Sequence, residues 1–191
     1  MISVAKTSFI AVIVMAATVT AASQASAGGL TLTSTAFSNG GTIGHHFTYH
    51  GYGCTGDNAS PALGWSGAPA GTKSFALTVY DPDAPHPGGW WHWVLFDLPA
   101  SARGLAENAG EDSSTHSLPA RAVQGRTDFG STSYGGPCPP PGKPHHYIFT
   151  LYALDVAAVR GASAKTTGPQ LDKQMAGHVL AKAKLVGLYS R

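Results

Sequence analysis

The chain has 191 residues and a formal net charge of +2, from 12 basic and 10 acidic side chains. This balance, without any basic stripe or block, excludes an extended nucleic-acid surface or an anionic-membrane surface. With 24 glycines, 13 prolines and many strand-like segments, the composition predicts an all-β or β-rich domain.

Residues 1–27 have the pattern of a cleaved export signal. Lys6 supplies a positive charge, an uncharged apolar run follows, and the small residues Ala25 and Ala27 form a signal-peptidase site. The apolar run is shorter than the roughly 20 residues of a membrane helix. We therefore expect cleavage after Ala27, a mature domain of residues 28–191 without a transmembrane segment, and a periplasmic or secreted location. An uncleaved anchor helix is the alternative.

The rest of the chain is expected to form one domain, because no repeat or linker divides it. Alternating or β-branched runs predict strands at 30–37, 74–80, 90–98 and 145–155. Glycine and proline predict irregular segments at 51–63 and 131–144, and 100–118 is polar and loop-like. Apolar residues at spacings of three and four predict a helix from Pro169 to Val186, ended by Gly187.

Two histidines stand near the start of two predicted strands, each on a mostly apolar face. Strict alternation places His92 on one face with three apolar side chains, those of Trp90, Val94 and Phe96. In the same way His145 shares its face with Tyr147. A single histidine of this kind is usually a hydrogen-bonded core residue. Two of them, with Asp81 at the exit of a neighbouring strand, predict a shared pocket at one end of the sheet.

Several motifs then resemble one protein family. Asp-Pro-Asp-Ala-Pro at 81–85 and Gly-Trp-Trp-His-Trp-Val at 89–94 resemble the first signature of the phosphatidylethanolamine-binding protein family. Gly-Gly-Pro-Cys-Pro-Pro at 135–140, with His-His-Tyr at 145–147, is similar to its second signature. Residues 56–65 and 125–130 resemble the bacterial, Raf-kinase-inhibitor-like branch, so the resemblance covers the whole mature domain.

The resemblance implies an antiparallel β-sandwich, with a large central sheet, a smaller sheet and a C-terminal helix. It also implies a shallow pocket that binds phosphate, acetate-like anions or a phospholipid head group. The residues that match the family's pocket are Asp81, His92, His145 and Tyr147, with Pro85 and Trp91 as walls and the main chain of Gly136 as a further contact. The Ala84–Pro85 bond is the candidate for a cis peptide that such pockets often contain.

One departure from the family pattern concerns charge. His146 stands where the family often has arginine, so a fixed positive charge beside the pocket is expected to be lost. His146 also points to the opposite face from His145 in an alternating strand.

Cys54 and Cys138 are the only cysteines. An even pair in an exported chain, without Cys-x-x-Cys spacing, favours a disulfide over a metal or redox pair. Two separate free thiols are the alternative.

These features predict an exported protein that binds a small anionic or phosphorylated ligand without a cofactor. His92, His145 and the Tyr147 hydroxyl can donate hydrogen bonds to an anion. Asp81 is expected to orient a histidine or to accept from a protonated ligand. Binding is expected to strengthen as the pH falls through the histidine range near 6.5.

Three other functions stay open. Asp81, His92 and His145 also make a two-histidine, one-carboxylate set that suits a metal, and a second small cluster comprises His45, His46 and His50. The same set could perform acid–base hydrolysis, although no serine lies in a Gly-x-Ser-x-Gly context. The proline-rich segment 137–144 could serve a protein-interaction or inhibitor module with an unknown protein partner.

Overall fold

The computed structural model describes residues 1, 29–111 and 118–191. A six-stranded sheet has the strand order β2-β11-β10-β6-β7-β9, a three-stranded sheet has the order β1-β5-β8, and β3 pairs with β4. The predicted export signal lies almost entirely outside the described residues. The strands are β1 (Thr31–Ser34), β2 (Gly41–Thr42), β3 (His50–Gly51), β4 (Cys54–Thr55), β5 (Leu63–Ser66), β6 (Ser74–Asp81), β7 (Trp90–Pro99), β8 (Gly104–Leu105), β9 (Val123–Gln124), β10 (His145–Leu154) and β11 (Val179–Tyr189).

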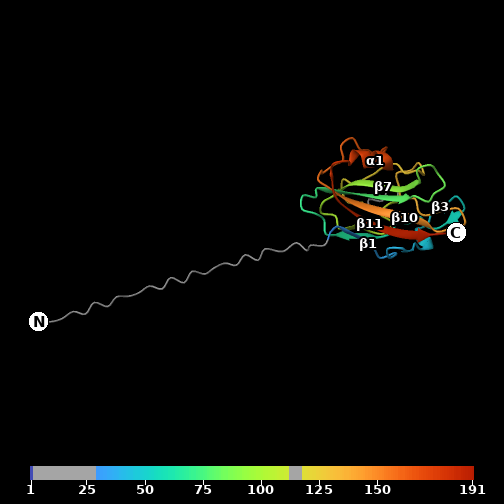
Figure 1. The fold of residues 1–191 in the computed structure, drawn as a ribbon, viewed down its shortest axis with the longest axis horizontal. Coiled ribbons are helices and arrows are strands. Elements are labelled where there is room, and N and C mark those ends of the chain that lie inside the picture. Colours follow the sequence, from blue (N-terminus) through green and yellow to red (C-terminus); the bar gives the residue numbers. More distant parts are fainter. Residues whose placement is uncertain (2–28, 112–117) are drawn as a thin grey trace.

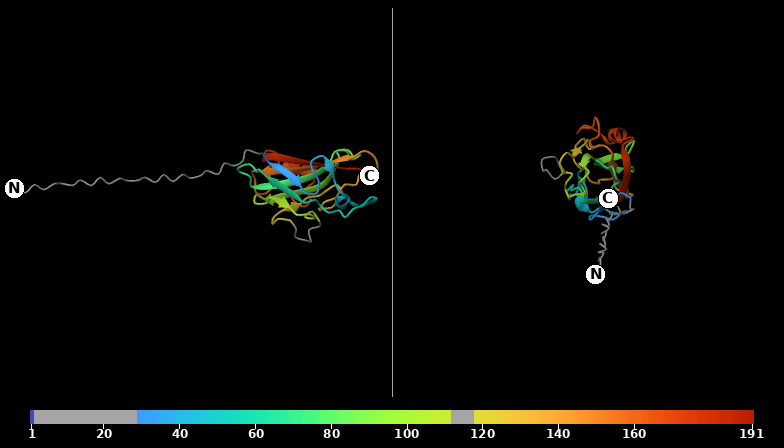
Figure 2. Two further views of the ribbon diagram at one scale, coloured as in Figure 1. Left: turned by 90° about the horizontal axis from the view of Figure 1, so that it is seen from below. Right: turned by 90° about the vertical axis from the view of Figure 1, so that its left-hand side faces the viewer.

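The large sheet is antiparallel except at one edge, where β2 runs parallel to β11. Its strands β6 and β10 are buried along nearly their whole length. Continuous burial of this kind arises when both faces of a sheet are covered. Figures 1 and 2 show the covering layers, with α1 (Gly168–Gln174) on one face and β1 on the other.

Each face of the large sheet therefore packs into its own apolar core. Trp93 and Leu95 of β7 point into the core shared with the small sheet, which contributes Leu32 and Trp65. The side chain of Val94, between these two residues, points to the other face of the sheet. There it belongs to a second core formed with α1, whose further members include Phe96, Tyr152, Leu154, Leu171 and Met175. The predicted β-sandwich with a large and a smaller sheet is confirmed.

The C-terminal helix is much shorter than its apolar spacing predicts. Helix α1 starts where the N–H of Thr167 donates to Oε1 of Gln170 (3.0 Å), and it ends at Gln174. Gly177 then has a φ of +82°, a left-handed conformation that an α-helix does not allow. The predicted continuation to Val186 is wrong, because residues 179–189 form strand β11 and pair with β10 over its whole length.

Three smaller expectations concern the loops. The first predicted strand is reduced to Thr31–Ser34, and the polar segment after residue 100 contains the short strand β8. Residues 131–144 contain no regular element, as their glycine and proline content predicts. No helix in the described part of the chain is long and apolar enough to cross a membrane.

Candidate functional site

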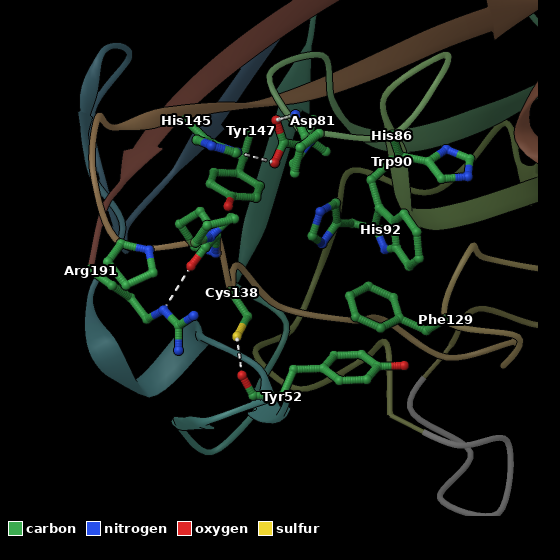
Figure 3. Close-up of a pocket in the computed structure, with 15 residues that line it drawn as sticks. Tyr52, Asp81, His86, Trp90, His92, Phe129, Cys138, His145, Tyr147 and Arg191 are labelled. Atoms are coloured by element: carbon green, nitrogen blue, oxygen red, sulfur yellow. Dashed lines mark hydrogen bonds and ion pairs between the residues drawn. The ribbon is translucent and has the colours of Figure 1, made fainter.

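One cavity of about 430 Å³ lies at the end of the large sheet, where β6 ends and β7 and β10 begin (Figure 3). Antiparallel pairing explains this position. Asp81, the last residue of β6, pairs with Trp90, the first residue of β7, and β10 flanks β6 on the other side. The lining residues are Tyr52, Asp81, Ala84, Pro85, His86, Trp90, His92, Phe129, Cys138, Pro139, Pro140, Pro141, His145, Tyr147 and Arg191.

A β-bulge turns His92 into this cavity. The pairing of β6 with β7 shifts by one residue between Val79 and Tyr80, and His92 is the residue left without a partner. A bulge redirects the side chains on either side of it. The expectation that His92 shares a face with Val94 and Phe96 is therefore wrong, because these two side chains pack under α1. The expectation that it shares a face with Trp90 is correct, since both line the cavity.

Asp81 and His145 form a buried pair at the base of the cavity. Oδ2 of Asp81 accepts a 2.8 Å hydrogen bond from Nδ1 of His145, and the Asp81 side chain is only 3% exposed. Its other oxygen, Oδ1, accepts the N–H groups of Asp83 (2.8 Å) and Ala84 (3.1 Å). Asp81 thus holds both the loop after β6 and the ring of His145. This is the orienting role that the sequence predicts for it.

His92 differs from the sequence-based expectation in its charge. Nδ1 donates a 2.6 Å hydrogen bond to the carbonyl of Gly135, and the side chain is buried. Burial lowers the pKa of His92 from 6.5 to about 4, because desolvation outweighs the opposing effects of Gly135 and Asp81. His92 is therefore neutral near pH 7. It does not become an imidazolium near pH 6.5, so its protonation does not provide the expected gain in anion binding over that range.

The Tyr147 hydroxyl is a deeply buried polar group of the cavity. Tyr147 is 1% exposed, and its oxygen has no hydrogen-bond partner among the described residues. Burial, and then the charge of Asp81, raise the pKa of Tyr147 well above its ordinary value, so the hydroxyl keeps its proton. A buried hydroxyl without a hydrogen-bond partner lowers the stability of the fold unless a ligand or a water molecule accepts its hydrogen bond.

Arg191 restores a fixed positive charge to the cavity. His146 stands where the family often has arginine. The guanidinium of Arg191, which follows β11 in the sequence, lines the cavity near Tyr52. His146 itself lies outside the cavity, where its Nδ1 and main-chain N–H both contact Oδ2 of Asp83 at 2.8 Å. No spacing pattern in the sequence marks Arg191, because it is far in sequence from every other pocket residue.

Two predicted contacts are placed outside the cavity, and a third differs in geometry. Trp91 packs against Tyr80 (4.7 Å between ring centres) and against Gly168, on the far face of the sheet; Trp90 lines the cavity in its place. Gly136 does not line the cavity, and its N–H donates to Asn58 (2.7 Å). Pro85 does line it, but the Ala84–Pro85 bond is trans, against the cis expectation.

An aromatic wall rises along one side of the cavity. Phe129 contacts Trp90 edge to face, with 5.5 Å between ring centres. The exposed ring of Tyr52 lies nearly parallel to that of Phe129, with 6.3 Å between ring centres. His86 contacts the other edge of Trp90. Figure 3 shows these four rings opposite Asp81, His145 and Arg191. Phe129 belongs to the segment 125–130 that carries the family resemblance, whereas Tyr52 has no sequence signal.

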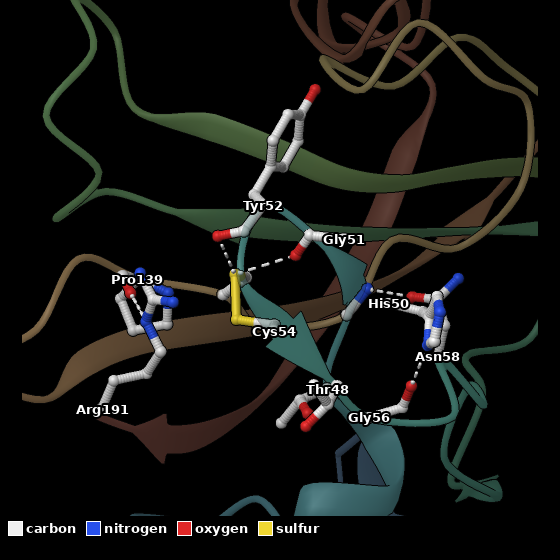
Figure 4. The surroundings of a disulfide bond; sticks show 12 residues. Thr48, His50, Gly51, Tyr52, Cys54, Gly56, Asn58, Pro139 and Arg191 are labelled. Carbon is white, nitrogen blue, oxygen red and sulfur yellow. Dashed lines mark hydrogen bonds between the residues drawn. A yellow bond between two sulfur atoms is a disulfide. The ribbon is translucent and has the colours of Figure 1, made fainter.

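The predicted disulfide is present. Cys54 of β4 is bonded to Cys138 (Figure 4). Cys138 lines the cavity together with the prolines at 139–141, which we call the proline-rich wall. The N–H of Tyr49 also donates to the carbonyl of Pro137 (3.0 Å). The β3–β4 hairpin and the proline-rich wall are therefore joined by a covalent bond and a hydrogen bond.

The metal alternative gains no support from the side-chain positions. Among the described residues, no group of three or more His, Cys, Asp or Glu side chains is placed so that it could hold a metal ion. Asp81 is already occupied by His145 and by two N–H groups. In the second histidine cluster, His46 bridges Asp57 and Glu107, while His45 and His50 contact Thr55 and a main-chain carbonyl.

The fold and the site together define a two-layer β-sandwich whose larger sheet carries, at one end, a mainly apolar, aromatic-lined pocket with a few buried polar groups. The chain belongs to the phosphatidylethanolamine-binding protein family, whose model matches residues 33–190. Membership of this family suggests binding of a small ligand.

Curated relatives and solved structures agree with this membership. The chain is 42% identical to the protein YbcL of Escherichia coli over 87% of its length and 90% of the relative, and 44% identical to YbhB over 80% and 94%. The crystal structure of E. coli YbcL, described as a new member of the mammalian PEBP family, has a TM-score of 0.82 and 41% identity, covering 86% and 99% of the two chains. A Chlamydia trachomatis homologue has a TM-score of 0.72 and 36% identity, covering 85% of this chain and 98% of its own.

Proposed function

We propose that this is an exported protein that binds a small phosphate-bearing ligand, such as a free phosphate ester or a phospholipid head group, in the cavity at the end of the large sheet. The observation that carries the proposal is the buried, unpartnered hydroxyl of Tyr147. It is a hydrogen-bond donor inside a cavity that is large enough for a small molecule. An anionic oxygen of a ligand would complete it.

The neighbouring groups support an oxygen-rich ligand of negative charge. Arg191 provides a permanent positive charge at the mouth of the cavity. Nδ1 of His145 donates to Asp81, so Nε2 is left for a ligand and donates to an anion only when the ring is an imidazolium. Hydrogen bonds from such groups to a charged ligand contribute about 1.5–3 kcal/mol each. The family's description, which names phosphatidylethanolamine, fits this chemistry.

The decisive variant is Tyr147→Phe, which removes only the unpartnered oxygen. Its affinity for phosphoethanolamine, measured by calorimetry or NMR titration, is expected to fall by about 1.5–3 kcal/mol. Its melting temperature is expected to stay equal or to rise, because no protein hydrogen bond is lost. His146→Ala is the matched control, since this side chain lies outside the cavity, and it is expected to bind normally. Equal binding by wild type and Tyr147→Phe would refute the proposal.

The Asp81–His145 pair favours a second candidate, general-base hydrolysis of a bound ester. A carboxylate that accepts from Nδ1 leaves Nε2 able to activate a nucleophile, as in hydrolytic triads. None of the described residues that line the cavity is a serine or threonine, so in this candidate water is the attacking group. The test is release of phenol from phenyl phosphate and phenyl acetate by wild type and by His145→Ala. Rates equal to the buffer control would reject this candidate.

A further inference from the structure

Nε2 of His92 is a hydrogen-bond acceptor that faces the cavity. This follows from the other ring nitrogen: the carbonyl of Gly135 has no proton, so Nδ1 of His92, 2.6 Å away, must carry the hydrogen between them. A neutral ring then has a lone pair on its other nitrogen, Nε2. The structure gives Nε2 no hydrogen-bond partner among the described residues, and the ring lines the cavity. This nitrogen is therefore left to accept a proton donor from a ligand.

The ring of His92 is kept neutral by its surroundings. It is 3% exposed and packs edge to face against Phe129 (5.3 Å) and Tyr147 (5.1 Å between ring centres). The acidic groups that act on it are Asp81 from β6 and Asp128 from the loop that carries Phe129. Their effect is smaller than that of burial, which lowers the pKa of His92 to about 4.

Beside this acceptor lies an atom that can only donate to an anionic ligand. The hydroxyl of Tyr147 is buried, protonated and unpartnered, and its ring contacts that of His92. The other ionisable groups that line the cavity are Tyr52, Asp81, His86, His145 and Arg191. Asp81 already accepts three hydrogen bonds, two on Oδ1 and one on Oδ2, so only one acceptor position of its carboxylate remains.

We infer that the cavity selects an oxyacid in its singly protonated, monoanionic form, such as the monoanion of a phosphate monoester. The P–O–H group of the ligand donates to Nε2 of His92, and its unprotonated oxygens accept from Tyr147 and Arg191. This inference rests on the proposed phosphate-binding function and narrows it to one protonation state. A dianion leaves the His92 lone pair facing a ligand lone pair, which is repulsive.

The experiment compares methyl phosphate with methyl sulfate. Both are tetrahedral monoesters of similar size, but methyl sulfate carries one negative charge and no proton throughout the working range, whereas the monoanion of a phosphate monoester loses its proton with a pKa of about 6. The dissociation constants of both ligands are measured on the whole protein from pH 5 to pH 8. Methyl sulfate reports only the effect of protein groups on binding, because its own charge is constant.

We expect methyl phosphate to bind at least about tenfold more tightly than methyl sulfate at pH 5, because only it completes His92. Above pH 6 the dissociation constant of methyl sulfate divided by that of methyl phosphate is expected to fall by about tenfold per pH unit, as the monoanion is depleted. His92→Phe, which lacks the acceptor, is expected to bring the ratio close to one at every pH. The wild-type ratio decides the inference even if this variant folds poorly.

Two contrary results have different meanings. A ratio near one at pH 5, or one that does not fall above pH 6, would overturn the selection of the monoanion while leaving phosphate binding intact. No binding of methyl phosphate at any pH would overturn both this inference and the proposed phosphate-binding function.

Discussion

Nε of Arg191 donates a 2.7 Å hydrogen bond to the carbonyl of Pro139, and the carbonyl of Arg191 accepts the N–H of Gly142 at 3.2 Å. Arg191, two residues beyond the end of β11, is thus attached at two points to the proline-rich segment that forms one wall of the cavity. Its guanidinium is held at the cavity mouth while its terminal nitrogens stay available. Arg191 therefore has both a structural and an electrostatic role.

Replacing Arg191 with glutamine is expected to weaken the binding of phosphoethanolamine by about 1 kcal/mol, because one exposed charge is removed from the cavity mouth. Titration calorimetry at low and moderate salt measures the effect. Arg191→Lys is the control that keeps the charge, and it is expected to recover most of the affinity. If the glutamine variant binds as tightly as wild type, the charge of Arg191 does not act on the ligand.

Removing the disulfide through the double substitution Cys54→Ser and Cys138→Ser is expected to lower the free energy of unfolding. The bond closes a loop with a sequence separation of 84 residues. In the chain-entropy model a loop of that size contributes at most about 4–5 kcal/mol. Urea denaturation of the variant and of reduced wild type measures the loss, and the two are expected to agree. Ligand affinity is expected to fall as well, since Cys138 lines the cavity.

The protein is expected to lose stability as the pH falls from about 6.5 to about 4. His92 is neutral when folded, with its pKa lowered to about 4, whereas the unfolded chain takes up a proton near 6.5. The unfolded state binds more protons in this window, so acid favours unfolding, by roughly 3 kcal/mol in total. His46 acts in the opposite direction, because Asp57 and Glu107 raise its pKa, but solvent screens this exposed side chain. Urea unfolding at pH 7, 6, 5 and 4 measures the slope.

His92→Phe, with no ionisable group at this position, is the control for that pH dependence. Its unfolding free energy is expected to vary less between pH 6.5 and pH 4 than that of wild type, whatever its absolute stability. A wild-type stability that stays flat over this window would show that His92 is not the neutral, buried histidine described above.

Expression with export is expected to give a mature protein that starts at Gly28, since the small residues Ala25 and Ala27 make the signal-peptidase site. Intact mass spectrometry of the purified protein gives the start. Retention of Lys6 would contradict cleavage. Reduction is expected to add two daltons to the mature mass, through opening of the bond between Cys54 and Cys138.

Local sequence patterns predict the centre of the site better than its boundary. Asp81, His145 and Tyr147 are found because regular alternation holds at the ends of β6 and β10. Regular alternation puts Trp90 on the face of His92 and so identifies the wall residue, whereas the family motif points to Trp91, which lies outside the cavity. The β-bulge at His92 left no such signal, because it appears only in the pairing of two strands.

The remaining errors have a common physical cause. The apolar spacing from Leu171 to Val186 is compatible with both a helix and a strand, and pairing with β10 decides for the strand after Gly177. Arg191 and Tyr52 reach the cavity through contacts between distant parts of the chain. Tertiary pairing, which no local period encodes, therefore determines the second half of the C-terminal segment and the rim of the pocket.

The position of β11 also has a consequence for the order of events during synthesis. This strand follows all the others in sequence, yet it lies between β2 and β10 inside the large sheet. A growing chain that lacks it leaves the long edge of β10 unpaired and the cavity without Arg191. Closure of the large sheet therefore has to wait until β11 has been made, although most of the sheet precedes it in the sequence.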